Sequence, residues 1–345
     1  MNEFGDTVEK EIMTVTWDMS AAEKGGYQHF MLKEIMEQPK AVADTVKPRI
    51  KNDAVVFEDN GLTDERLREI EHIHIIGCGS ALHAGMVGKR VIEAMCRIRC
   101  TAEVASEFRY ENPIIGKKDM CIVISQSGET ADTLAAMRLA KQAGAFTIAI
   151  VNVVSSTIAR EADGVLYTWA GPEISVATTK AYSAQLSALY LISVKIARVR
   201  GLISIGDERA LCAELQRLPE CIEQTLKCQS DMQRIATLYA NRSSVFFLGR
   251  GLDYAAALEA SLKLKKFPIF NSEAYAAGEL KHGTISLIEE GTLVVALATQ
   301  PALFEKTVSN IREVVARGAS VVLVTTDDFT GDESVCQHIV RLPKC

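Results

Sequence analysis

The segment MCIVISQSGETADT, residues 120–133, decides the fold class. It begins with an apolar, β-branched run that is typical of a buried strand. The small residues Ser125-Gln126-Ser127-Gly128 follow, and Glu129-Thr130 opens a stretch with helical periodicity. A strand that leads through a short turn into a helix is the repeating unit of parallel α/β proteins.

Four similar β-branched runs surround this segment. Together the five runs cover residues 72–79, 100–106, 120–128, 146–152 and 164–170, and amphipathic helical stretches separate the first four. This alternation predicts a mainly parallel sheet flanked by helices. A long helical run at 178–201 follows, and residues 207–228 have the pattern of a helical connector.

The alternation restarts in the second half of the chain. Strands are predicted at 243–251, 292–300, 320–328 and 338–343, with a helix at 302–318. The Gly77/Gly79 pair after the first strand recurs at Gly249/Gly251, which indicates an internal duplication. The predicted fold class is therefore α/β, with two tandem three-layer α/β/α units.

We expect four parts along the chain. They are a connector and N-terminal helical segment at 1–40, a first unit at 41–203, a helical connector at 204–230, and a second unit at 231–345 that is truncated at its C-terminus. A chain of 345 residues is long enough for two compact domains.

Composition excludes several classes of partner. The net charge is −6 and no basic stripe is present, so we expect no nucleic-acid partner. The N-terminus lacks the apolar core of a signal peptide and no apolar run reaches ~18 residues, so we expect no membrane association and a cytoplasmic location.

Nine cysteines are scattered without a CxxC pair, and several stand inside apolar runs. This pattern indicates buried thiols in a reducing compartment rather than disulfides or metal ligands. We expect neither a metal site nor a cofactor.

Residues 125–130 are candidates for binding a phosphate group, and we call them the 125–130 turn. Ser125, Ser127 and Thr130 can donate hydroxyl hydrogen bonds, and Gly128 allows the backbone to approach an anion closely. The turn precedes the positive end of a helix dipole and follows a parallel strand, where α/β sheets bind ligands. The alternative is an ordinary helix N-cap.

A dinucleotide site is disfavoured. The turn after the first predicted strand is Gly77-Cys78-Gly79-Ser80, and Leu82 stands where the third glycine of GxGxxG belongs. No acidic residue ends a strand ~20 residues later, where one would hold a ribose.

A series of motifs, in order, gives the chain a close resemblance to a known family. They are HFMLKEIMEQP (29–39), VASEFRY (104–110), SQSGETADTL (125–134), ISVATTKAY (174–182), FLGRG (247–251) and SEAYAAGELKHG (272–283). The chain resembles the sugar isomerase (SIS) family of phosphosugar-binding domains, and most closely the isomerase half of the glutamine:fructose-6-phosphate aminotransferases, also called glucosamine-6-phosphate synthases.

The resemblance implies a role for each matching residue. It assigns the sugar phosphate to Ser125, Gln126, Ser127 and Thr130, the sugar site to Ser80 and Val176, and an active-site amine to Lys263. It implies that His282 serves ring opening in the neighbouring subunit of a homodimer, for which the apolar helix at 178–198 offers a surface. The alternative for His282 is a loop histidine that caps a turn before Gly283.

The chemistry of the family needs a base beside C1 and C2 of the sugar. Ammonia adds to the ketone of open-chain fructose 6-phosphate, and a carboxylate then moves a proton from C1 to C2. The family places this glutamate sixteen residues before the Lys-His-Gly histidine, where this chain has Lys266. Glu273 and Glu279 are nearby carboxylates, but they match structural positions of the family rather than the position of the base. We therefore expect catalysis to be impaired.

Three explanations of Lys266 stay open. Lys263 and Lys265 could lower its pKa enough for it to act as the base. It could instead cap a helix C-terminus before Pro268. The third is a compensated frameshift over residues 266–271. With synonymous codons chosen to fit, one deleted and one restored adenine would convert Lys-Glu-Ile-Ser-Tyr-Ile-His-Ser into the Lys-Lys-Phe-Pro-Ile-Phe-Asn-Ser of this chain.

Both ends also differ from the family. Asn2 stands at the beginning of what resembles an interdomain connector, so we expect no glutaminase domain, and Lys344 does not match the family's tail lysine.

Three functions remain. They are an isomerase domain that binds fructose 6-phosphate or glucosamine 6-phosphate, a stand-alone SIS deaminase or deglycase of aminated sugar phosphates, and a non-catalytic phosphosugar sensor.

Overall fold

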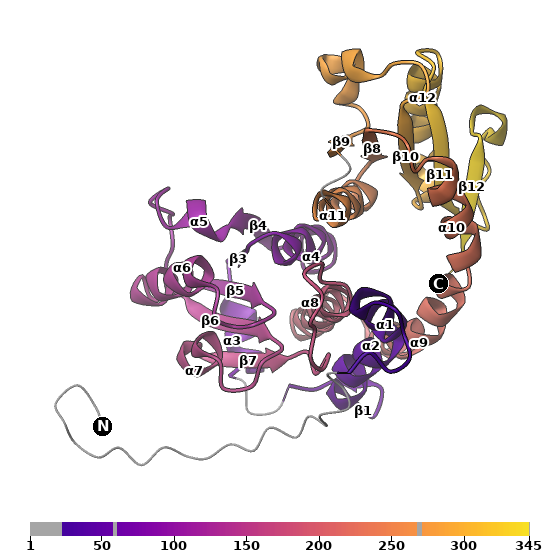
Figure 1. The fold of residues 1–345 in the computed structure, drawn as a ribbon. Coiled ribbons are helices and arrows are strands. Elements are labelled where there is room, and N and C mark those ends of the chain that lie inside the picture. Colours follow the sequence, from indigo (N-terminus) through magenta and orange to yellow (C-terminus); the bar gives the residue numbers. More distant parts are fainter. Residues whose placement is uncertain (1–22, 58–60, 268–270, 345) are drawn as a thin grey trace, which may run out of the picture.

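A computed structural model describes residues 23–57, 61–267 and 271–344 of the chain. It contains two five-stranded parallel sheets, each covered by helices on both faces (Figure 1). The predicted α/β class with two tandem three-layer units is confirmed.

The first sheet has the strand order β4-β3-β5-β6-β7. Its strands are β3 (His72–Gly77), β4 (Arg99–Val104), β5 (Asp119–Ser125), β6 (Phe146–Val151) and β7 (Gly164–Tyr167). Alternate residues of each strand face opposite helical layers. Ile73 and Ile75 of β3 belong to the same core as Leu189, whereas Ile76 packs with Met137.

The helices of the first unit form its two outer layers. The helices are α3 (Asp64–Glu69), α4 (Ser80–Cys96), α5 (Ala105–Phe108), α6 (Ala131–Gln142), α7 (Thr157–Glu161) and α8 (Lys180–Val199). α4 and α8 lie on one face of the sheet, and α5, α6 and α7 on the other (Figure 1). α8 is mostly buried against α4 and α2, so the expectation that this helix offers a dimerisation surface is wrong.

The second sheet has the order β12-β11-β10-β8-β9. Its strands are β8 (Ser244–Gly249), β9 (Asn271–Ala276), β10 (Leu293–Ala298), β11 (Ser320–Thr326) and β12 (His338–Leu342). α12 (Phe304–Val315) contributes Ile311 to the core on one face, and α11 (Leu252–Lys265) contributes Ala257 to the core on the other. β9 was not predicted, because its polar and small residues NSEAYA lack an apolar run, and it lies at the sheet edge beside β8.

Further helices precede the first unit and connect it to the second. α1 (Phe30–Met36) and α2 (Gln38–Val46) precede a β1 (Ile50–Lys51) and β2 (Ala54–Val55) hairpin, and α9 (Ile205–Leu226) and α10 (Gln229–Leu238) lead to β8. α9 starts with a capping box in which Ser204 and Asp207 bond each other's backbone N–H groups. α11 packs against α4, so helices of the two units meet directly (Figure 1).

Eight of the nine cysteines lie in the described part of the chain and are free thiols, and Cys345 lies outside it. Burial raises the pKa of the Cys96 thiol to about 12 and that of Cys212 to about 11. These thiols behave as small apolar core residues, as the sequence predicts.

Within the described ranges, no helix combines the length and the apolar composition that a membrane crossing requires.

Candidate functional site

The 125–130 turn connects β5 to α6 and carries three hydroxyl groups at the carboxyl edge of the sheet. Ser125 Oγ accepts a hydrogen bond from Gly128 N at 3.0 Å and lies 2.9 Å from Thr130 Oγ1. Ser127 Oγ accepts from Glu129 N at 3.2 Å. The N–H groups of Gly128 and Glu129 are therefore bonded within the turn. Ser125 and Thr130 share one hydroxyl hydrogen in their mutual hydrogen bond, so two of the three hydroxyl hydrogens remain available to donate to a ligand.

The N-cap alternative does not explain the hydroxyl groups. α6 starts at Ala131 with Thr130 as its N-cap, and the Thr130 side chain makes no capping hydrogen bond. The helix therefore presents its positive dipole end at the turn without a side-chain cap, which favours a negatively charged ligand there.

Gly128 is required for the shape of the turn. Its φ is +67°, and a Cβ built on it would lie 1.9 Å from Ser156 Oγ. Only glycine combines this left-handed backbone with so close an approach to a neighbouring side chain.

A cavity of about 330 Å³ opens beside the turn, and we call it the central cavity. Its volume is within the usual range for small-molecule sites. Six predicted site residues line it, namely Ser80, Ser125, Gln126, Ser127, Thr130 and Lys266. Because Lys266 follows α11, both units contribute to the cavity.

Two lining residues with a hydroxyl or amide side chain were missed by the sequence analysis. They are Thr178, which precedes α8, and Gln185, one turn inside α8. Gln185 is 3% exposed, and its Oε1 has no hydrogen-bond partner among the described residues. A buried amide oxygen without a partner is costly, and a hydroxyl-bearing ligand would satisfy it.

A charged cluster joins the units beside the central cavity. Glu259 of α11 contacts His83 Nδ1 of α4 at 2.7 Å and also pairs with Lys263. Lys263 Nζ donates to Ser80 Oγ at 2.8 Å. Burial alone would raise the pKa of Glu259, but the hydrogen bonds from His83 and Lys263 outweigh it and hold the pKa below its ordinary value. Glu259 therefore stays ionised and fixes the Lys263 amine at Ser80.

Lys266 is the C-cap residue of α11, and its amine points to the first unit. Nζ donates to the carbonyl oxygen of Val176 at 2.6 Å. The side chain is thus bonded to a loop of the first unit. Burial, together with the positive charge of Lys263, lowers the pKa of the Lys266 amine.

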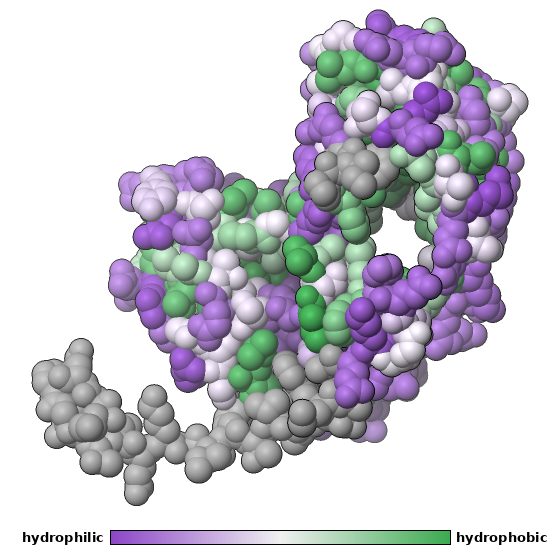
Figure 2. Space-filling model, in the orientation of Figure 1, coloured by the Kyte–Doolittle hydropathy of each residue, from purple (hydrophilic) through white to green (hydrophobic). Residues whose placement is uncertain are grey.

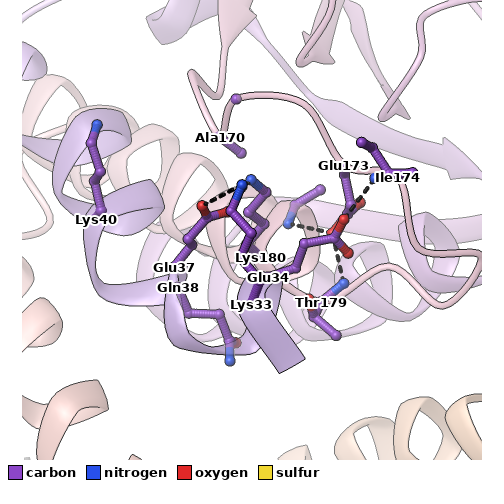
Figure 3. A network of polar contacts seen from close by, with 12 residues as sticks. Lys33, Glu34, Glu37, Gln38, Lys40, Ala170, Glu173, Ile174, Thr179 and Lys180 are labelled. Atoms are coloured by element: carbon purple, nitrogen blue, oxygen red, sulfur yellow. Dashed lines mark hydrogen bonds and ion pairs between the residues drawn. The ribbon is translucent and has the colours of Figure 1, made fainter. Parts of the chain in front are cut away.

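The loop that receives Lys266, residues 171–179, is held by a network of buried charges (Figure 3). Glu34 of α1 is 2% exposed, and its Oε1 accepts hydrogen bonds from Ile174 N at 2.6 Å and Ser175 N at 3.0 Å. Burial raises the pKa of Glu34, and the neighbouring Glu173 adds to this effect. Glu34 thereby fixes two successive peptide groups, Glu173–Ile174 and Ile174–Ser175.

A second part of the network fixes the start of α8 (Figure 3). Glu173 Oε1 accepts from Thr179 N at 2.8 Å, and Lys180, which is 3% exposed, pairs with Glu37 Oε2 at 2.6 Å. α1 therefore positions the loop that supplies Thr178 and the Val176 carbonyl to the site.

The remaining predicted residues lie outside the central cavity. The Val176 side chain is 84% exposed and borders an adjoining hollow of about 570 Å³ with α1 and Phe267. Hydrophobic side chains gather on the surface between the two units, whereas most of the outer surface is hydrophilic (Figure 2). His282 is exposed, in the short 3-10 turn Leu280–His282. Residues 268–270 of the 266–271 segment lie outside the described residues.

Comparisons with known proteins agree with this geometry. The SIS domain family matches residues 66–195 and 238–343. The chain is 53% identical over 341 residues to glutamine–fructose-6-phosphate aminotransferase (isomerizing) of Caldanaerobacter subterraneus subsp. tengcongensis, and 44% identical over 343 residues to that of Methanosarcina mazei. Each match covers 99% of this chain, which spans 56% of the length of these curated relatives.

Solved structures give the same result. The C-terminal domain of glucosamine-fructose-6-phosphate aminotransferase from Francisella tularensis has a TM-score of 0.89 and 34% identity, and the match covers 93% of this chain and 91% of that one. Glucosamine-6-phosphate deaminase from Thermotoga maritima, at 23% identity and a TM-score of 0.68, shares the fold alone, over 91% of this chain and 88% of that one. The chain belongs to the SIS domain family, and within it to the C-terminal isomerase domains of the glutamine–fructose-6-phosphate aminotransferases.

Proposed function

We propose that the central cavity binds a hexose 6-phosphate, and that the chain acts as the domain which converts fructose 6-phosphate to glucosamine 6-phosphate. The 125–130 turn carries this proposal, because three hydroxyl groups and an uncapped helix N-terminus converge there. Gln185 and the Lys263–Ser80 pair provide polar groups for the sugar hydroxyls.

The proposed order of events uses these groups in turn. The 125–130 turn holds the phosphate and fixes the sugar chain across the cavity. Lys263, which is ion-paired with Glu259 and bonded to Ser80, polarises an oxygen near the reacting carbons. Proton transfer between C1 and C2 requires a base, and Lys266 is the family's base position in this chain.

We propose that this last step is impaired. A protonated lysine cannot accept a proton, and although burial and Lys263 lower its pKa, the amine also donates a hydrogen bond to Val176 O, which favours the charged form. The hydrogen bond from the Lys266 amine to Val176 O supports a phosphosugar sensor as the second candidate function, because a sensor needs the 125–130 turn but no base.

We also propose a homodimer in which His282 serves the partner's cavity, since it is exposed and lies outside the cavity of its own subunit. Two exposed apolar side chains, Tyr110 at 75% and Ile114 at 94%, offer a contact surface. Light scattering should give a dimer, and Tyr110→Ser with Ile114→Ser should weaken it. A folded wild-type monomer at all concentrations would refute this arrangement.

Calorimetric titration with fructose 6-phosphate tests the binding proposal. Ser127→Ala combined with Thr130→Ala removes two hydroxyl donors, each worth on the order of 1 kcal/mol, so affinity should fall at least tenfold. Thr237→Ala is the matched control, because this hydroxyl bonds Gln233 O on the distant helix α10. Unchanged affinity in the double variant would show that the phosphate binds elsewhere.

A further inference from the structure

Lys266 differs from the neighbouring Lys263 and Lys265 in the charges that surround its amine. Lys263 pairs with Glu259, and Lys265 pairs with Glu273 at 3.3 Å. Lys266 makes a 2.6 Å hydrogen bond to a neutral carbonyl, and no ion pair joins it to a carboxylate within the described part of the chain. It lines the central cavity together with the 125–130 turn.

The two carboxylates that influence Lys266 electrostatically are already bonded to other groups. Glu259 contacts His83 and Lys263, and Glu173 accepts from the backbone of Thr179 and from the Thr178 hydroxyl. Among the described residues that line the cavity, Lys266 is therefore the one cation, and none of them supplies a counter-charge. A partly desolvated cation in this situation attracts an anionic ligand group, and charge-assisted hydrogen bonds are stronger than neutral ones.

The 125–130 turn and the Lys266 amine reach the cavity from different elements. The 125–130 turn follows β5, the central strand of the sheet, whereas Val176, which fixes the Lys266 amine, belongs to the loop after the edge strand β7. The hydroxyl groups and the helix dipole at β5 can hold a phosphate without Lys266, so the Lys266 amine is available for a second anionic group of the same ligand.

We propose that the central cavity prefers a phosphosugar that carries a carboxylate at the end opposite its phosphate, that is, a phosphorylated sugar acid. This inference rests on the proposed phosphosugar binding and adds the ligand class. The phosphate occupies the 125–130 turn, and the carboxylate accepts a hydrogen bond from Lys266 Nζ in place of the Val176 carbonyl.

Calorimetry with two probes of equal length tests the inference. The probes are 6-phosphogluconate, which has a carboxylate at C1, and glucitol 6-phosphate, which has a neutral hydroxyl there. The wild type should bind 6-phosphogluconate at least about tenfold more tightly than glucitol 6-phosphate, as expected for a charge-assisted hydrogen bond. Lys266→Gln should lower the affinity for 6-phosphogluconate about tenfold more than the affinity for glucitol 6-phosphate, which removes the preference, and Lys266→Arg should retain it.

Lys265→Gln is the matched control, because it removes a neighbouring lysine that is paired with Glu273 and lies outside the cavity lining. This variant should keep the full preference. If Lys265→Gln also loses it, the preference comes from net charge rather than from the position of Lys266, and the inference is wrong.

The other outcomes are distinguishable. Equal affinity of the wild type for both probes would overturn the inference and leave the phosphosugar function intact. An equal loss for both probes in Lys266→Gln would place Lys266 on the phosphate, which also overturns it. Failure of the folded wild type to bind either probe would refute the phosphosugar function itself.

Discussion

Gly128→Ala is the substitution that tests most sharply whether the 125–130 turn is a rigid structure. The added Cβ would lie 1.9 Å from Ser156 Oγ and 2.5 Å from Ser156 Cβ, and the backbone has a φ of +67°. A left-handed conformation costs about 1–2 kcal/mol in an alanine, and overpacking costs about 1–3 kcal/mol. We therefore expect Gly128→Ala to lower the free energy of unfolding by about 2–5 kcal/mol.

Gly201 provides a control that separates the two costs. Its φ is +70°, and a Cβ there would meet nothing within 4 Å. Gly201→Ala should therefore cost only the backbone term of about 1–2 kcal/mol. Ser156→Gly, combined with Gly128→Ala, removes the steric clash and should recover most of the difference between the two alanine variants.

Denaturant unfolding, with calorimetry for fructose 6-phosphate, measures both consequences. Gly128→Ala should also weaken ligand binding, because relief of the clash moves the backbone of the turn. If Gly128→Ala costs no more than Gly201→Ala and leaves the affinity unchanged, the turn is adaptable and the argument from its rigid geometry is wrong.

Two further predictions concern the α11 segment. Glu259→Gln should leave Lys263 without its carboxylate, so phosphosugar affinity should fall several-fold. Because the fold stabilises the ionised form of Glu259, its contribution to stability should be present above pH 4.5 in the wild type and be lost as the pH falls through its lowered pKa. Denaturant unfolding at a series of pH values should show this contribution in the wild type and not in the variant. Replacing residues 266–271 with Glu-Ile-Ser-Tyr-Ile-His should raise turnover of fructose 6-phosphate with ammonia by about 10²-fold or more, the usual contribution of a general base. Equal turnover of the two proteins would show that Lys266 works as a base.

The sequence predicted the fold and the local part of the site. Strand-to-helix alternation identified both parallel sheets, because buried parallel strands give continuous apolar runs. Ser125, Ser127, Gly128 and Thr130 were recognised because they stand within six residues of one another, so their proximity needs no knowledge of tertiary packing.

The long-range part of the site was not predictable from pattern. Glu34 lies 140 residues before Ile174, whose backbone it holds, and His83 lies 176 residues before Glu259. Gln185 stands in an apolar helix where nothing in the sequence indicates that its amide faces a cavity. These contacts depend on how α1, α4, α8 and α11 pack, and a helical period alone does not fix that packing.

The direct test of the central claim is a crystal structure of the chain with fructose 6-phosphate bound. We expect the phosphate to accept hydrogen bonds from the hydroxyl groups of Ser125, Ser127 and Thr130, with the sugar extending toward Ser80, Gln185 and Lys266. A phosphate bound away from the 125–130 turn, or a sugar outside the central cavity, would contradict the account.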